Sequence, residues 1–407
     1  MSIHKKYLFA VPVLNFLVAT WFGMILRTMI IQPMPFNFKF ITHAHSHVAI
    51  LGWVYMALFL LLTQHFTGKI GRDFQRLFWI TEISVIGMIV GFPTEGYGTV
   101  SIVSSSVYIL FSYIFSLLIL KKIKGKKSAA YTLLRTSIVW LCLSTISLWA
   151  LGPIIVLLGS TSKPALLMIQ YFLHFQLNGW FLFAIVALVF KLFKIPDSKN
   201  FRIFHRAFVL SLIFTFSLPI NWYYDFSVFR WLNNAGIVFQ LIALVYGSKL
   251  ISSNYKVRFS KLDRLSKLLL IFATVGLVMK IVFQSFSLVP EIARNIFDNR
   301  QAVIGFIHLM MLGIISAFIL FMFKQMLKNR LAVRLFNAGV YLFLSGIILT
   351  ELILLYQGLC YYYPWLSIPD YRFFLWIFSF LLLIGIYIVL TAILNTDFKK
   401  FKAEEKH

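Results

Sequence analysis

The sequence predicts an all-α membrane protein, and three observations support that fold class. Of the 407 residues, 60% are hydrophobic and only 13% are charged, with a mean hydropathy of +0.86. Soluble globular domains are roughly one-half apolar and about one-quarter charged. The apolar residues fall in runs of about 20, the length of helix that crosses ~30 Å of hydrocarbon. The basic residues lie in short segments between alternate apolar runs.

Twelve apolar runs are long enough to be transmembrane helices. The first of them is too long for a signal peptide and lacks a small-residue cleavage site, so we interpret it as a span. The predicted spans are residues 8–31, 42–64, 77–93, 100–121, 136–158, 165–190, 205–222, 231–252, 267–288, 301–325, 334–356 and 373–395. No linker is long enough to separate soluble domains. The whole chain, 1–407, is therefore predicted to be a single membrane domain.

The connections between these spans alternate in charge. Lysine and arginine gather in 68–76, 121–127, 194–202, 256–267, 324–330 and 399–402, whereas the intervening connections carry few. By the positive-inside rule, this pattern predicts a multi-pass protein of the cell (inner) membrane with both termini in the cytoplasm. The net charge of +25 does not indicate nucleic-acid binding, because the basic residues are not clustered in one region.

A short motif recurs once in each third of the chain. It reads HVAILGW at 47–53, HFQLNGW at 174–180 and HLMMLGI at 308–314, so a glycine always follows the histidine by five residues. The three copies lie in the second, sixth and tenth spans. This register predicts three four-helix pseudo-repeats, approximately 1–130, 131–260 and 261–400.

Histidines at membrane depth suggest a cofactor. Ionisable side chains there are costly, so they usually face the bundle interior and carry a role. Imidazole binds haem iron, and two axial histidines make a low-spin electron-transfer centre. Successive helical residues are ~100° apart, so His43 and His47 should share one face and His45 should face nearly opposite. The alternative is that each histidine only hydrogen-bonds a neighbouring helix, which is the favoured interpretation of His43.

The topology and several motifs resemble the main subunit of the haem-copper oxidase and nitric oxide reductase superfamily. HSHVAILGW (45–53) is similar to a histidine-x-histidine stretch on the tenth helix of the C-type oxidases. FNFKFITHAH (36–45) resembles the segment before the low-spin haem histidine. GMILRTMIIQP (23–33) resembles the end of the first helix, where an arginine lies beside that haem. HFQLNG and FIHLMMLG match the registers of the sixth- and tenth-helix motifs.

The resemblance implies a set of ligands. His47 and His308 would be the axial ligands of a low-spin haem b, with His45 as the substitute if the register is shifted by two residues. Arg27 would correspond to the arginine beside the haem, where guanidinium groups pair with propionates. His174 would take the place of the histidine that binds the non-haem metal.

The departures from the superfamily imply an incomplete binuclear centre. Phe306 stands where the second tenth-helix histidine should be, and the span 205–222 lacks the expected histidine pair. We therefore do not expect the protein to reduce oxygen. His43, His45 and His174 would be left for a different site, with copper or a second haem as the candidates.

Two acidic residues fall within spans as well. Glu82 lies in the third predicted span and Glu351 in the eleventh. Each is either part of a proton path or a hydrogen-bonded contact between helices, and the sequence leaves both interpretations open.

These observations predict a haem b-binding membrane protein with an electron-transfer or redox role related to nitric oxide or oxygen. If it is an enzyme, it is an oxidoreductase of the haem-copper oxidase type. No haem-attachment motif occurs, so a quinol or a separate cytochrome is the expected electron donor, and a partner subunit is a further expected partner. Two alternatives stay open: a haemless transporter or metal-handling protein built on the same repeat, and a nitric-oxide-response protein that carries haem and copper without being a reductase.

Overall fold

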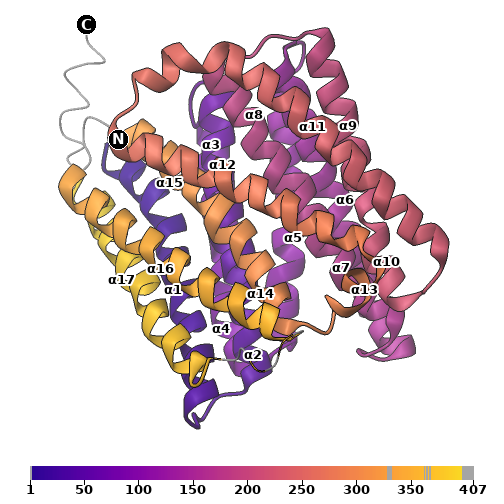
Figure 1. Ribbon diagram of the computed structural model, residues 1–407. Coiled ribbons are helices and arrows are strands. Elements are labelled where there is room, and N and C mark those ends of the chain that lie inside the picture. The colour runs from indigo at the N-terminus through magenta and orange to yellow at the C-terminus, as the bar shows by residue number, and fades with distance from the viewer. Residues whose placement is uncertain (1, 328–331, 362, 364, 366–367, 397–407) are drawn as a thin grey trace, which may run out of the picture. The chain divides into compact units, whose positions relative to one another are not determined.

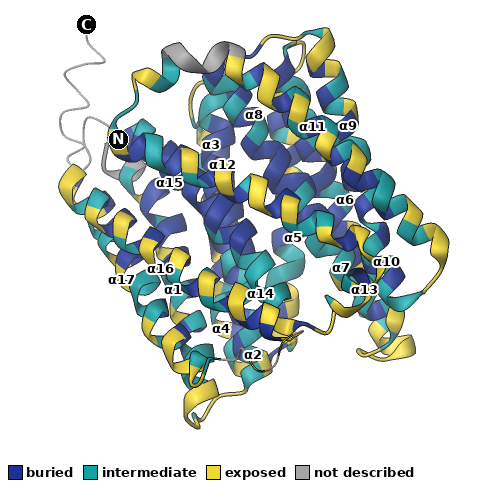
Figure 2. Cartoon of the chain, in the orientation of Figure 1, coloured by how far each residue is buried: buried dark blue, intermediate teal, exposed yellow. Residues whose placement is uncertain are grey.

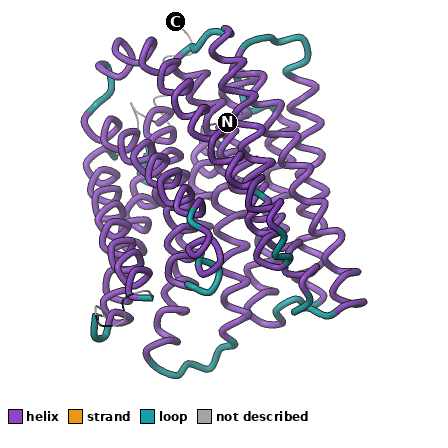
Figure 3. The backbone as a smooth tube through the Cα atoms, turned by 45° about the vertical axis from the view of Figure 1, so that its right-hand side comes forward, coloured by secondary structure: helices purple, strands orange, loops and turns teal. Residues whose placement is uncertain are grey.

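The chain is helical throughout the part that the structure describes. The computed structural model describes residues 2–327, 332–361, 363, 365 and 368–396, with no strand among them (Figure 1). Within these residues, twelve helices are long and apolar enough to cross a membrane. This confirms the predicted all-α class and the predicted number of spans. Up to α15, short loops join the long helices (Figure 3).

The chain divides into two compact units. Unit 1 comprises 1–64, 69–111 and 316–407, and unit 2 comprises 65–68 and 112–315. The helices that lie wholly or mainly in unit 1 are α1 (Ser2–Ile31), α2 (Phe38–His47), η1 (Val48–Tyr55), α3 (Met56–Thr67), α4 (Arg72–Glu95), α15 (Ala317–Leu327), α16 (Val333–Cys360) and α17 (Tyr371–Leu394).

Helix α5 (Thr99–Lys122) begins in unit 1 and ends in unit 2. The remaining helices of unit 2 are α6 (Ala129–Leu158), α7 (Lys163–His174), η2 (Phe175–Phe181), α8 (Leu182–Phe193), α9 (Lys199–Thr215), α10 (Ser217–Tyr223), α11 (Ser227–Ser260), α12 (Arg264–Ser285), η3 (Phe286–Leu288), α13 (Pro290–Asn295), α14 (Arg300–His308) and η4 (Leu309–Ser316). The three predicted pseudo-repeats stay a prediction.

The spans that carry the repeated histidines are among the most buried. In the most apolar stretch of each, 83% of the residues are buried in Phe38–Thr67, 67% in Lys163–Phe193 and 56% in Arg300–Leu327. Of the other nine spans described, only Lys6–Ile31 reaches 56%, and the rest lie between 22% and 50%. Helices α3 and α15 are accordingly dark blue along most of their length in Figure 2.

Each of these three spans contains a π-helical segment, which starts directly after the repeated histidine. Segment η1 follows His47, η2 follows His174 and η4 follows His308. A π-helix bonds each N–H to the carbonyl five residues earlier; it is rare, and it often occurs at functional sites. Nothing in the apolar pattern predicts this backbone. The same local conformation therefore marks the same position of the motif three times.

Glycines bring α16 and α17 of unit 1 into backbone contact, and α1 packs beside them (Figure 1). A Cβ placed at Gly385 would lie 2.7 Å from the backbone N of Phe343 and 2.8 Å from the carbonyl O of Gly339. Backbone atoms at such distances cannot move aside as a flexible side chain could. Small residues at helix crossings are a common way for membrane helices to pack closely.

We expect Gly385→Ala to destabilise unit 1, because the added methyl group forces α16 and α17 apart. Overpacking of this kind costs roughly 1–3 kcal/mol. The measurement is the thermal unfolding midpoint in detergent, followed by tryptophan fluorescence. The matched control is Gly152→Ala, since no heavy atom lies within 4 Å of a Cβ there. Equal midpoints for the two variants would contradict the close-packing argument.

Candidate functional site

Helix α2 carries the three closely spaced histidines of unit 1. Its N-cap is Asn37, whose side chain accepts hydrogen bonds from the backbone N of Lys39 (3.0 Å) and of Phe40 (3.2 Å). Asparagine is a preferred N-cap because its oxygen satisfies N–H groups of the first turn. The cap fixes where the helix starts and therefore which way each histidine faces.

His45 faces α1. Its Nδ1 lies 2.8 Å from the carbonyl O of Ala19, so Nδ1 donates the hydrogen bond. A Cβ at Gly23 would lie 3.1 Å from Cε1 of His45. The imidazole thus rests against a stretch of α1 where a glycine leaves room for it.

His43 and His47 face the other way, as the helical spacing predicts. The ring of His47 lies 4.1 Å from that of Phe92, and the ring of His43 lies 4.6 Å from that of Tyr97, measured between centroids. Phe92 belongs to α4, and Tyr97 lies in the connection to α5. Burial raises the pKa of Tyr97, which keeps its phenol protonated at neutral pH.

Each of these two histidines has an Nε2 atom that makes no hydrogen bond with a described residue. Nδ1 of His47 lies 2.9 Å from the carbonyl O of His43 and therefore donates to it. Nε2 of His47 makes no hydrogen bond to any described residue, so its lone pair is available. Nε2 of His43 is buried, and it too has no hydrogen-bond partner in the described part of the chain.

Arg27 has an acidic neighbour within its own unit. Glu351 on α16 and Tyr371 at the start of α17 lie within electrostatic reach of its guanidinium group. His45 is also within electrostatic reach of Arg27. The protein itself therefore supplies an acidic group, Glu351, for the positive charge of Arg27.

A cluster of buried polar side chains donates hydrogen bonds to backbone carbonyls of the π-helix η1. Nδ2 of Asn15 donates to the carbonyl O of Gly52 at 3.1 Å, and it lies 3.1 and 3.0 Å from the two carboxyl oxygens of Glu82. The hydroxyl of Tyr108 donates to the carbonyl O of Leu51 at 3.1 Å. Side chains of α1, α4 and α5 thus engage this segment. Glu82 accepts a hydrogen bond from Asn15 of α1. It therefore makes a hydrogen-bonded contact between helices, one of the two interpretations that the sequence leaves open.

His174 of unit 2 is also tied to a carbonyl, but through the other ring nitrogen. Its Nε2 lies 2.8 Å from the carbonyl O of Leu212 on α9. Only Nδ1 is then left to bind anything else. The rings of Phe175 and Phe216 flank it at 5.0 and 5.4 Å between centroids. This orientation differs from that of His47, although the two motifs match in sequence.

His308 ends α14 and is half-buried. The glycine five residues later, Gly313, lies against α12: a Cβ at Gly276 would be 3.5 Å from the carbonyl carbon and oxygen of Gly313. The other two glycines lie closer to their neighbours: a Cβ at Gly52 would meet Asn15 and Val85, and one at Gly179 would meet Trp140 and Leu212, all within 3.3 Å. In these two motifs the glycine is therefore a point of close approach to a neighbouring helix, whereas Gly313 makes an ordinary van der Waals contact with α12.

No three-ligand metal site occurs among the described residues. No group of three or more histidine, cysteine, aspartate or glutamate side chains is placed to hold a metal ion. The predicted metal ligands His43, His45, His47, His174 and His308 are therefore not assembled into such a group. This finding concerns copper or zinc, which require such a set. A haem needs at most two protein ligands, because the porphyrin supplies four nitrogens.

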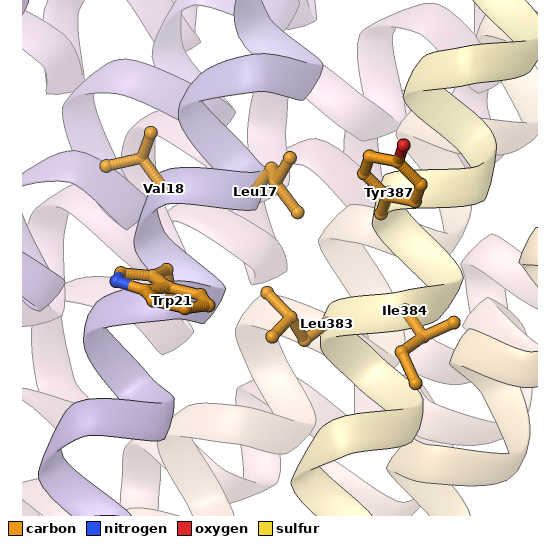
Figure 4. A pocket seen from close by; sticks show the side chains of 6 residues that line it. All are labelled: Leu17, Val18, Trp21, Leu383, Ile384 and Tyr387. Atoms are coloured by element: carbon orange, nitrogen blue, oxygen red, sulfur yellow. The ribbon is translucent and has the colours of Figure 1, made fainter.

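An apolar groove lies on the surface of unit 1 between α1 and α17 (Figure 4). It contains none of the predicted site residues. Its lining side chains are Leu17, Val18, Trp21, Leu383, Ile384 and Tyr387. With a lining of aliphatic and aromatic groups, this is a surface suited to lipid chains rather than to a polar ligand.

Comparison with known proteins does not identify a family. No protein-family model matches the chain, and no curated protein matches it. The resemblance to the haem-copper oxidase superfamily therefore stands on the motifs alone.

Several residues of these sites were not singled out in the sequence. Phe92 and Tyr97 are ordinary aromatics near a span boundary, and Gly23 is one glycine among 21. Lys280 of α12 lies within electrostatic reach of His174, and it is a clearer omission because it is the only charge deep inside the predicted span 267–288. A scan for lone charges within apolar runs would have found it.

We expect Asn15→Leu to destabilise the protein, because it leaves the Gly52 carbonyl and the Glu82 carboxyl without their shared donor. Loss of a buried hydrogen-bond partner costs roughly 1–3 kcal/mol per orphaned group. The measurement is the thermal unfolding midpoint in detergent. The control, Glu82→Gln, keeps an oxygen that can accept from Asn15, so its midpoint should stay near that of the wild type. A larger loss for Glu82→Gln than for Asn15→Leu would contradict this assignment.

Proposed function

We propose that this protein binds haem b through His47 and has an electron-transfer or redox role related to nitric oxide or oxygen. The observation that carries the proposal is the state of the His47 imidazole. Its Nδ1 is committed to the His43 carbonyl, and its Nε2 makes no hydrogen bond to a described residue. Histidines that ligate metals usually donate their other N–H to a carbonyl or carboxylate, which fixes the tautomer and the ring orientation.

The surroundings of His47 support this assignment. Phe92 and Tyr97 give the histidine face an aromatic wall, and aromatic surfaces suit a flat macrocycle. The buried Nε2 of His43, without a partner, indicates that this face lacks a component that hydrogen-bonds or coordinates. The π-helix that begins at the next residue adds weight, since π-helical turns concentrate at functional sites.

The second axial ligand stays a prediction. His308 is supported by its motif and by η4, which follows it as η1 follows His47. His45 is the substitute for His47 if the register is shifted by two residues, and its Nδ1 is likewise hydrogen-bonded to a carbonyl. Arg27 and His174 keep the predicted roles of propionate partner and second metal site, although Arg27 lies within electrostatic reach of Glu351 and His174 is hydrogen-bonded to the Leu212 carbonyl.

When bound, haem b supplies reversible one-electron chemistry. The chain's own part is to hold the iron-binding nitrogen in a fixed direction and to exclude water from it. Both tasks follow from the hydrogen bond of Nδ1 and from the aromatic wall. A quinol or a cytochrome is the proposed electron donor, and the cell (inner) membrane with both termini cytoplasmic is the proposed location.

Haem content tests the proposal directly. Protein purified from cells supplied with a haem precursor should be coloured, and its reduced spectrum should show the sharp α band of a six-coordinate haem b. We expect His47→Ala to lose most of its haem per polypeptide, because the ligand is removed, while His205→Ala should keep it. His205 is a matched control because it is hydrogen-bonded to Thr136 within unit 2.

Parallel variants separate the remaining assignments. His308→Ala tests the second ligand, because loss of that ligand should change the spectrum to that of a five-coordinate haem. His45→Ala tests the substitute for His47, because only the variant that lacks the true ligand of the second span should lose its haem. Copper analysis of wild type and His174→Ala tests the second metal. A colourless wild-type protein, or a His47→Ala variant with full haem content, would contradict the proposal. The former result would favour the haemless transporter.

A further inference from the structure

The strongest unexplained feature outside the histidine site is a polar seam between α11 and α12 of unit 2. Nδ2 of Asn233 donates to the hydroxyl of Ser287 at 2.9 Å, and Nε2 of Gln240 donates to Oε1 of Gln284 at 3.3 Å. On α12 and the short η3 that continues it, Lys280, Gln284 and Ser287 are spaced by four and three residues. They therefore lie on one face of the helix. The seam runs along that face.

Lys280 has no visible counter-charge. It is only 3% exposed and makes no hydrogen bond or salt bridge with any described residue. The titratable group within electrostatic reach of it is His174. All acidic residues of unit 2 lie in the connections between spans: Asp197, Asp225, Asp263, Glu291 and Asp298. A lysine buried in a membrane protein generally faces a water-filled space or a partner.

Three buried amide oxygens of unit 2, two of them on the seam, also lack partners. Oδ1 of Asn233, Oε1 of Gln240 and Oδ1 of Asn221 on α10 are buried without a hydrogen bond within the described chain. Exchanging the amide O and N of Asn233 would still leave one of the two atoms without a partner, because the Ser287 hydroxyl bonds only one of them. Hydrocarbon offers no partner to any of these groups.

The chemistry of the unsatisfied groups identifies what they bind. A metal cation is disfavoured beside the Lys280 amino group, and an anion is disfavoured beside the unpaired amide oxygens of Asn233 and Gln240. Water donates to the oxygens and accepts from the ammonium, so it satisfies both. Buried waters typically bind otherwise unsatisfied polar groups in this way.

We propose that unit 2 holds a water-filled polar tract between α11 and α12, with Lys280 at its inner end. Ser287 lies in η3, next to the connection that leads to α13, so the tract opens at that end of the unit. Seven residues separate Ser287 from Lys280, which places the lysine roughly 10 Å further in along the helix axis. The tract gives water and protons access to Lys280 and to the vicinity of His174.

Cysteine accessibility tests the tract. Cys142 and Cys360, the two native cysteines, are both free, and a Cys142→Ser, Cys360→Ser protein provides the background. Gln240→Cys, Gln284→Cys and Ser287→Cys place a thiol in the tract. The matched controls Val238→Cys and Val282→Cys place one on the exposed side of the same two helices, where 55% and 47% of the side chain is exposed.

Silver ions are the probe, because they are small and react with thiolates, which form only in contact with water. The purified variants are reconstituted in vesicles, silver nitrate is supplied on both sides by freeze–thaw, and unreacted thiols are counted afterwards with a maleimide in detergent. We expect the tract positions to react roughly tenfold faster than the controls, since a thiol in hydrocarbon stays protonated.

The proposal would be overturned if Gln240→Cys and Gln284→Cys reacted with silver no faster than the controls Val238→Cys and Val282→Cys. Ser287→Cys is nearly isosteric and keeps the test valid if a glutamine variant fails to fold. Lys280→Met, combined with Gln240→Cys, should slow the reaction, because it removes the charge that holds the water. None of these residues is a proposed haem ligand, so the outcome is independent of the haem content.

Discussion

Every polar group within the spans has to find its partner inside the protein, because hydrocarbon supplies none. This constraint accounts for most of the side-chain geometry described above. His45 and His174 each reach a backbone carbonyl on a neighbouring helix. Asn15 serves a carbonyl and a carboxyl at once. The groups that remain without partners are consequently the most informative ones in the structure.

Two sets of those groups differ in chemistry. Beside α4 in unit 1, the Nε2 atoms of His43 and His47 lie next to aromatic rings, which suits a flat, metal-centred ligand. Between α11 and α12 in unit 2, the amide oxygens of Asn233 and Gln240 lie on the same seam as Lys280, which suits water. The same desolvation argument thus supports the proposed cofactor at the first place and the proposed water at the second, because the residue types differ.

The π-helical segments connect the histidines to the packing around them. A π-helical turn widens the helix and shifts the residues that follow around its axis, so its carbonyls no longer align with those of a regular helix. In η1, the carbonyls of Leu51 and Gly52 receive hydrogen bonds from Tyr108 and Asn15. Neighbouring helices approach closely at Gly52 in η1 and at Gly179 in η2. In these two motifs the histidine and the glycine therefore belong to one structural feature.

The sequence by itself determined the fold class, the number of spans, and the division of the second span into a face with His43 and His47 and a face with His45. These features follow from hydrophobic length and helical periodicity, which are local properties. Tertiary structure alone decided which nitrogen of each imidazole is used, that Glu351 lies near Arg27, that Phe92 and Tyr97 border the histidines, and that Lys280 is buried without a counter-charge. Each of these depends on which helices meet and at what height, and a periodic apolar pattern carries no information about either.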